Sequence, residues 1–258
     1  MNDEELDSRV ELLVKEAQNG SKFARDQLYK LINPLFDKPI SAEMEKEIST
    51  TIDYIIHKLV YENYCETNKE GFFNDDYLCY FARSIPAPKL KSGRFYMCGD
   101  TQFFYKLSAG KYALGRLDGL NHGVEAGLIV LTARRYLDEF LKKGVFIPKE
   151  LAKRLADKMY LIPRKGASAF TTLFVSILDN STAYLSCVGD GQTMLLQSKN
   201  DTLAVIKPFG PVIGLAGPEL LNTIEYKTEE FELHKGDVIL SYTDGINERE
   251  GFELQKIK

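Results

Sequence analysis

The stretch VILSYTDG at residues 238–245 decides the fold of this chain, because an apolar strand there runs directly into an acidic turn. Two similar stretches lie upstream, LGRLDG at residues 114–119 and MCGD at residues 97–100. Carboxylates at strand ends can converge where the strands of a sheet end, and they then repel one another unless a cation lies between them. Hard divalent cations such as Mg²⁺ and Mn²⁺ prefer such oxygen ligands. The three stretches therefore favour a carboxylate-bound metal centre that carries out hydrolysis.

Each acidic turn also has a simpler interpretation. Asp-Gly is a common turn dipeptide, because Gly accepts a positive φ and Asp forms a hydrogen bond with its own backbone. Taken singly, each pair is more often a turn than a metal ligand. Only the combination of the three favours a metal site.

The composition excludes several classes of protein. The chain has 258 residues with a net charge of -4, and this length fits one large domain or two smaller ones. The charge gives no basic face for nucleic acid, and no apolar run reaches the length of a membrane span. The acidic, polar N-terminus does not resemble a secretory signal. The four cysteines lack metal-ligand spacing, so we interpret them as free thiols of a cytoplasmic protein.

The hydrophobic periodicity changes near residue 72. Residues 1–72 show helical spacing and predict a module of about three helices, with Ser21 and Ser41 as N-caps. Residues 73–258 are dominated by short strands, interrupted by two consecutive helices that begin near Val124 and at Lys149. The expected strands cover residues 77–84, 95–98, 103–107, 112–117, 169–178, 182–188, 193–197 and 237–242. This order predicts an α+β fold, an antiparallel β-sandwich flanked by helices, with an N-terminal all-α module.

Four short motifs follow one another within residues 73–258. They are GD at residues 99–100, DGLNHG at 118–123, CVGDG at 187–191 and GDVILSYTDG at 236–245. In order and spacing they resemble the metal-dependent protein phosphatases of type 2C. The similarity is strongest to the bacterial branch that contains the sporulation stage II protein E and the phosphatases that regulate the general stress sigma factor. It covers roughly residues 77–250.

The resemblance implies a set of site residues. Asp100, Asp118, the backbone carbonyl of Gly119 and Asp244 are the expected ligands of two Mn²⁺ or Mg²⁺ ions, with Asp118 bridging them. His122 is the expected catalytic residue, either as a general acid or as the holder of a metal-bound water. A capping or packing role at the following helix start is the alternative for His122.

Further residues have less specific expectations. We interpret Asp190, in the third motif, as a hairpin residue rather than a principal ligand. A phosphate-binding cation is also needed, and Arg suits this role geometrically. The basic residues near the motifs do not allow a choice among themselves, and a solvated surface charge is the alternative for each: Arg94, Arg116, Arg164 and Lys165.

The similarity ends before the last family motif. In the family, helical segments and a strand opening with Asp-Asp follow the Thr-Asp-Gly turn, whereas this chain ends at Lys258, 14 residues after Asp244. The phosphatase-like domain, residues 73–258, is therefore expected to lack one metal-binding aspartate. Three explanations compete: a truncated chain, a degenerate phosphatase fold, or replacement of the missing pair by Asp75-Asp76.

Two functions remain open at this stage. The leading hypothesis is a metal-dependent serine/threonine phosphatase that dephosphorylates a regulatory protein such as an anti-anti-sigma factor. Residues 1–72 would then be a regulatory module, with homodimerisation through their helices. The alternative is a weakly active or inactive phosphatase-fold scaffold that binds a regulatory partner. Neither hypothesis involves nucleic acid or a membrane.

Overall fold

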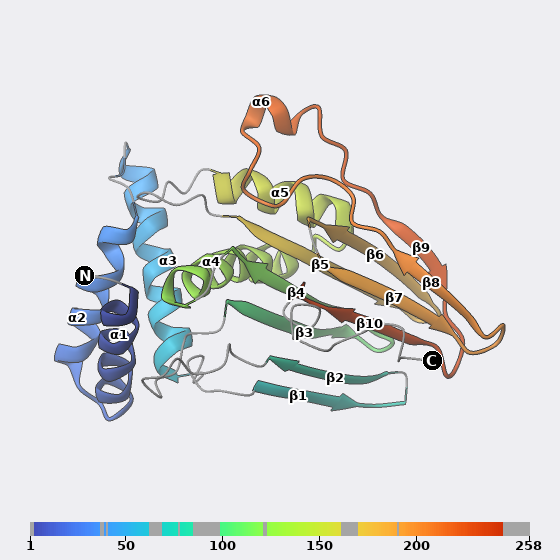
Figure 1. Cartoon of the computed structure of the whole chain (residues 1–258), viewed down its shortest axis with the longest axis horizontal. Helices are drawn as coiled ribbons and strands as arrows, with labels where there is room; N and C mark the ends of the chain where they lie inside the picture. Colours follow the sequence, from blue (N-terminus) through green and yellow to red (C-terminus); the bar gives the residue numbers. More distant parts are fainter. Residues whose placement is uncertain are drawn as a thin grey trace.

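The structure, a computed structural model, describes residues 3–36, 39, 41–61, 69–76, 78–84, 99–120, 123–160, 170–189 and 191–244. Within these residues the chain forms N-terminal helices, two larger antiparallel sheets, a separate two-stranded hairpin and further helices (Figure 1). The α+β sandwich expected from the sequence is thus confirmed. No helix in the described part of the chain combines the length and apolarity of a bilayer span.

Three helices open the chain as the periodicity predicts. Both expected N-caps are confirmed, because the hydroxyl oxygens of Ser21 and Ser41 accept hydrogen bonds from the backbone N–H groups of Ala24 and Met44, each at 3.2 Å. Gly20 ends the first helix with a φ of +91°, which a side chain would disfavour. The elements are α1 (Asp3–Gln18), α2 (Lys22–Ile32), the 3-10 turn Asn33–Leu35 and α3 (Ala42–Tyr61).

Two sheets form the centre of the molecule. The five-stranded sheet has the order β3-β4-β5-β6-β9, and the three-stranded sheet has the order β10-β7-β8. The strands of the larger sheet are β3 (Asp100–Ser108), β4 (Lys111–Gly119), β5 (Thr171–Asp179), β6 (Thr182–Val188) and β9 (Glu229–Glu232). Those of the smaller sheet are β7 (Gln192–Gln197), β8 (Thr202–Ile206) and β10 (Val238–Tyr242).

Strand β4 shows how the two sides of the large sheet are used. Side chains alternate along a strand, so Tyr112 and Leu114 point to one face while Ala113 and Leu117 point to the other. The first pair belongs to a cluster shared with Leu195 of β7, between the sheets. The second pair belongs to a cluster formed with the helices α4 (Gly123–Lys142) and α5 (Pro148–Tyr160). The large sheet is therefore buried on both faces.

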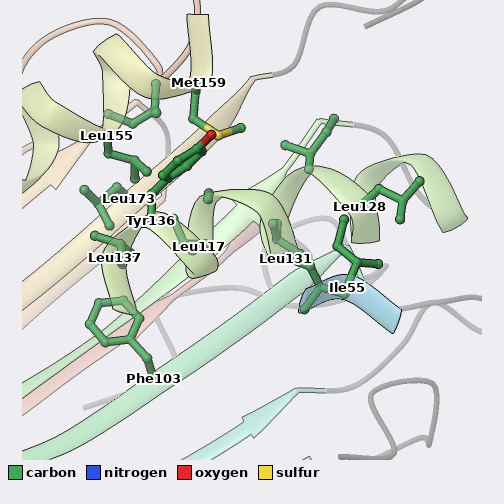
Figure 2. Packing of buried hydrophobic residues seen from close by; sticks show 14 of the residues in the cluster. Ile55, Phe103, Leu117, Leu128, Leu131, Tyr136, Leu137, Leu155, Met159 and Leu173 are labelled. Atoms are coloured by element: carbon green, nitrogen blue, oxygen red, sulfur yellow. The ribbon is translucent and has the colours of Figure 1, made fainter. Parts of the chain in front are cut away.

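Helix α4 is the centre of the second cluster. Fifteen of its residues are buried, because it lies between the large sheet and the N-terminal helices. Figure 2 shows its Leu131 and Leu137 in one cluster with Leu117 of β4 and Leu155 of α5, and with Ile55 of α3. The N-terminal helices are thus packed directly against the helix that follows the DGLNHG motif.

Polar contacts also join α3 to α4. The hydroxyl of Tyr54 donates to Asp138 Oδ2 at 2.8 Å, and Glu47 forms an ion pair with Arg135 at 2.8 Å. The same Asp138 accepts a hydrogen bond from Arg134, which is largely buried. Since buried polar groups cost free energy unless they are paired, these contacts fix the orientation of the module on α4.

Some elements were not expected from the sequence. They are β8, β9, the short helix α6 (Pro218–Leu221) and β1 (Lys69–Asn74), which pairs with β2 (Cys79–Ser84) in a separate hairpin. Strand β1 spans the expected boundary at residue 72. Strand β9 reads EEFE, a composition with low strand propensity, and it forms because it pairs with the edge of β6.

The outer face of the small sheet is apolar. Large side chains that are cross-strand neighbours are exposed there, and no described segment packs over them. They are Leu196, Leu203, Val205, Val238 and Leu240.

Candidate metal centre

Two carboxyl groups face each other at one end of the β3–β4 pair. Asp100 is the first residue of β3, and the antiparallel register places it directly opposite Asp118, next to the end of β4. Residues in such positions share a face of the sheet, with Cβ atoms about 5 Å apart. The two carboxyl groups are hydrogen-bonded to each other. The first two motifs are therefore brought into contact by strand pairing.

The electrostatics of this pair are unfavourable without a cation. Burial, and then the charges of Asp100 and Asp244, raise the pKa of Asp118 to about 9. Burial also raises the pKa of Asp100, while hydrogen bonds from Asp118 and Thr243 act in the opposite direction. Two acids this close share a proton near neutral pH. A cation that prefers oxygen ligands would relieve this repulsion, and its binding would require the pair to give up the shared proton.

The fourth motif reaches the pair from the other sheet. Thr243, just after β10, donates a hydrogen bond from Oγ1 to Asp100 Oδ2 at 3.0 Å. The next residue, Asp244, is exposed, and its charge raises the pKa of both paired acids. All three expected carboxylates thus lie within electrostatic range of one another. In the described part of the chain, however, no three His, Cys, Asp or Glu side chains are already arranged around a common ion position.

Gly119 lies where β4 meets α4. A Cβ at this position would lie 2.8 Å from the carbonyl oxygen of Ala126 and 3.0 Å from a methyl group of Val130. The backbone N–H of Gly119 donates to the carbonyl oxygen of Gly99 at 2.9 Å, beside Asp100. The absence of a side chain therefore has a packing reason, the close approach of α4 to the turn that follows Asp118. Coordination of a cation by its carbonyl stays a prediction.

One of the four candidate phosphate binders is described, and it is buried. The side chain of Arg116 lies on the same face of β4 as Asp118, and the residue is 8% exposed. Its Nε donates to Ser241 Oγ of β10 at 2.9 Å, and its Nη1 donates to Thr172 Oγ1 of β5 at 3.4 Å. Arg116 therefore links the strands that carry Asp118 and Asp244. Arg94, Arg164 and Lys165 lie outside the described residues.

Three other expectations have different outcomes. His122 and Asp190 lie outside the described residues, so their roles stay predictions. Asp75 accepts hydrogen bonds from Tyr112 and Lys106, at the end of β3–β4 opposite to the acidic pair. Asp118 lies six positions after Tyr112 along β4, a distance of about 20 Å. The idea that Asp75-Asp76 replaces a missing metal ligand is therefore wrong, because strand direction carries Asp75 to the wrong end of the sheet.

The residues present fit a hard divalent cation. The donor set consists of carboxylate oxygens, with a glycine carbonyl beside them, and hard cations select such ligands while retaining several waters. The buried acid pair, whose members raise each other's cost of ionisation, suits a positively charged ligand.

Sequence reasoning did not identify two supporting residues. Thr243 orients Asp100, and Ser241 accepts from Arg116 and contacts Thr193 Oγ1 at 2.9 Å. Both belong to the SYTDG segment, where alternation along the strand could have shown that Ser241 and Thr243 share a face. The pairing with β7 that makes this face internal is not visible in the sequence.

Comparison with known proteins gives a consistent result. The family model for stage II sporulation protein E (SpoIIE) matches residues 108–257. The stage II sporulation protein E of Priestia megaterium is 23% identical over 211 residues, which is 80% of this chain and 34% of the relative. That of Bacillus subtilis (strain 168) is 24% identical over 165 residues, 64% of this chain and 19% of the relative. The chain thus spans only about a third or less of these relatives.

Solved structures show the same fold. RsbX in complex with magnesium superposes with a TM-score of 0.54 at 15% identity, covering 69% of this chain and 80% of RsbX. The PP2C phosphatase domain of Bacillus subtilis SpoIIE, solved with a fragment of its regulatory domain, gives a TM-score of 0.50 at 23% identity. That match covers 63% of this chain and 46% of the SpoIIE chain. The described sandwich therefore has the type 2C phosphatase fold.

Proposed function

This chain belongs to the stage II sporulation protein E family, and on that basis we propose that it is a metal-dependent phosphatase acting on phosphoserine or phosphothreonine. The observation that carries the proposal is the opposed pair Asp100–Asp118, with Thr243 and Asp244 delivered to it from the other sheet. A buried acid pair next to a third carboxylate suits Mn²⁺ or Mg²⁺ and has no evident purely structural purpose.

Each residue has a defined task in this proposal. Asp100 and Asp118 would hold the cation once they had lost their shared proton, Asp244 and the Gly119 carbonyl would add oxygen ligands, and Thr243 would keep Asp100 in place. When bound, divalent cations activate water and neutralise negative charge on a phosphoryl group. His122 is proposed to donate a proton to the leaving oxygen or to hold a metal-bound water.

The substrate is proposed to be a phosphorylated regulatory protein of the anti-anti-sigma factor type. The support is family membership and the fold shared with RsbX and with the phosphatase domain of SpoIIE. SpoIIE is a cell fate determinant. Residues 1–72 are proposed to be a regulatory module that also joins two chains, because Leu12 and Phe23 are 57% and 69% exposed on α1 and α2. Sedimentation velocity at two protein concentrations tests that association.

Hydrolysis of p-nitrophenyl phosphate and of a phosphoserine peptide, with and without Mn²⁺, tests the activity. We expect turnover that requires the metal and is lost in Asp100→Asn and Asp118→Asn. Asp179→Asn is the matched control, because Asp179 pairs with Lys111 at the other end of the same sheet. Its activity should equal that of the wild type. Folded protein without turnover in millimolar Mn²⁺ would exclude the phosphatase.

A scaffold without catalysis is the second candidate. It is favoured by the lack of a preformed cluster of three metal-binding side chains among the described residues. In that case the protein would bind a phosphorylated regulatory protein without hydrolysing it, and Asp118→Asn would leave this binding unchanged. Isothermal titration with the phosphorylated partner, in parallel with the turnover assay, separates the two candidates.

A further inference from the structure

Arg116 stands out because its charge is buried in the apolar layer between the sheets. Its neighbours on the same face of β4, Tyr112 and Leu114, are core residues, and Arg116 itself is 8% exposed. Burying a charged group costs several kcal/mol unless opposite charge and hydrogen bonds compensate it. An arginine at this position therefore needs a compensating partner.

The hydrogen bonds of Arg116 do not supply that charge. Its described hydrogen-bond partners, Ser241 and Thr172, are neutral hydroxyls. Its Nη2 is buried and has no hydrogen-bond partner in the described part of the chain. Burial lowers the pKa of Arg116, and the groups that act on it through space in the opposite direction are Cys187 first, and then Asp118, Asp100 and Asp244. The three carboxyl groups among them couple the positive charge of Arg116 to the acidic site.

A glycine in the third motif makes room for this guanidinium. A Cβ at Gly191 would lie 2.0 Å from Nη2 of Arg116, and Gly191 has a φ of +103°. No side chain could be tolerated there without displacing the guanidinium. The backbone at Gly191 therefore restricts the position of the Arg116 guanidinium, which does not behave as a flexible surface side chain.

We propose that Arg116 takes the electrostatic place of one of the two divalent cations, so that without a phosphate ligand the acidic site holds a single cation. The inference rests on the proposed metal-dependent function. Three ionised carboxylates and one guanidinium leave two negative charges, which one divalent cation neutralises. A second cation would lie beside a fixed positive charge in a partly buried site, where repulsion is poorly screened.

The same geometry makes Arg116 a positioning residue. Through Ser241 it holds the end of β10, and two residues further Thr243 holds Asp100. Its positive charge favours the ionised form of Asp100 and Asp118 while no metal is bound. The electrostatic role, by contrast with this hydrogen bond, predicts that the charge at position 116 sets how many cations bind.

The test is Mn²⁺ binding by equilibrium dialysis in phosphate-free buffer, with electron paramagnetic resonance to detect coupled Mn²⁺ pairs. Wild type should bind one Mn²⁺ per chain, and a second ion only at a concentration about tenfold or more higher. Arg116→Met and Arg116→Gln should bind the second ion about tenfold or more tighter, with the coupled-pair signal appearing. Arg116→Lys keeps the charge and should resemble the wild type.

Arg135→Met is the matched control. Arg135 is equally buried but pairs with Glu47 of α3, away from the acidic site, so Mn²⁺ binding should not change. Two Mn²⁺ ions bound by wild type with similar affinity would overturn the inference and leave the proposed phosphatase intact. The inference would also be overturned if Arg116→Met and Arg116→Gln bound no second Mn²⁺ ion. It would be overturned as well if Arg116→Lys bound Mn²⁺ in the same way as Arg116→Met. Wild-type stoichiometry decides the question even if the neutral variants do not fold. Absence of any Mn²⁺ binding would instead remove the proposed metal-dependent function.

Discussion

Thr243→Val isolates the hydrogen bond to Asp100, one of the proposed metal ligands. The hydroxyl of Thr243 donates to Asp100 Oδ2 at 3.0 Å and is the link between the Thr-Asp-Gly turn and the acidic pair. Valine has nearly the same volume and the same branching at Cβ, so it removes the hydrogen bond without creating a large cavity. The change therefore tests orientation of Asp100 separately from packing.

The expected magnitude follows from the type of bond. A hydrogen bond to a charged group contributes about 1.5–3 kcal/mol. Because Thr243 is only partly buried, the lower end applies, and about 1.5 kcal/mol corresponds to roughly a tenfold weaker metal affinity. The loss should appear in metal affinity more than in stability, since the ionised carboxylate carries the bond when a cation is bound.

Calorimetric titration with Mn²⁺ measures this affinity, and urea denaturation without metal measures the stability. Thr243→Ser is the control, because it keeps the hydroxyl and should bind Mn²⁺ like the wild type. Equal Mn²⁺ affinity in the Val variant and the wild type would show that Thr243 does not position Asp100. Equal weakening in the Ser and Val variants would point to packing as the cause.

Three further changes test the acidic pair, the interface between helices and a turn. The raised pKa of Asp118, about 9 against 3.8, means that metal-free wild type loses stability as pH rises from about 4 to 9. Asp118→Asn should abolish this loss. With chelator present, the melting temperature of the variant should therefore exceed that of the wild type by an amount that grows toward pH 9. Melting temperatures that change with pH in parallel for the two proteins would contradict this reasoning. Tyr54→Phe removes the bond to Asp138 and should lower the free energy of unfolding by about 1 kcal/mol in urea titrations, and an unchanged midpoint would argue against this contact. Backbone hydrogen bonds from His234 and Ser198 lower the pKa of Asp237, so its stabilisation is present above pH 3.8 and lost as pH falls through the lowered pKa. Asp237→Asn should therefore melt below wild type at pH 7 and converge with it in acid; a gap that persists in acid would show another cause.

Local patterns in the sequence were sufficient for most elements. Helical spacing and the serine caps predicted α1 to α3, and the helices expected to begin near Val124 and at Lys149 correspond to α4 and α5. These features depend on residues within one or two turns of each other. Strands β8 and β9 were missed because their formation depends on pairing with β7 and β6, which local composition does not encode.

The sequence alone placed acidic residues at strand ends and, through the order of its motifs, indicated the family and Asp100, Asp118 and Asp244 as ligands. Only the tertiary structure decided which of them meet. The β3–β4 register opposes Asp100 to Asp118, and the strand direction carries Asp75 to the far end. The burial of Arg116 beside the acids was likewise decided by sheet packing. The physical reason is that contacts between distant strands depend on how the sheets share a core, a property of the whole chain and not of any short segment.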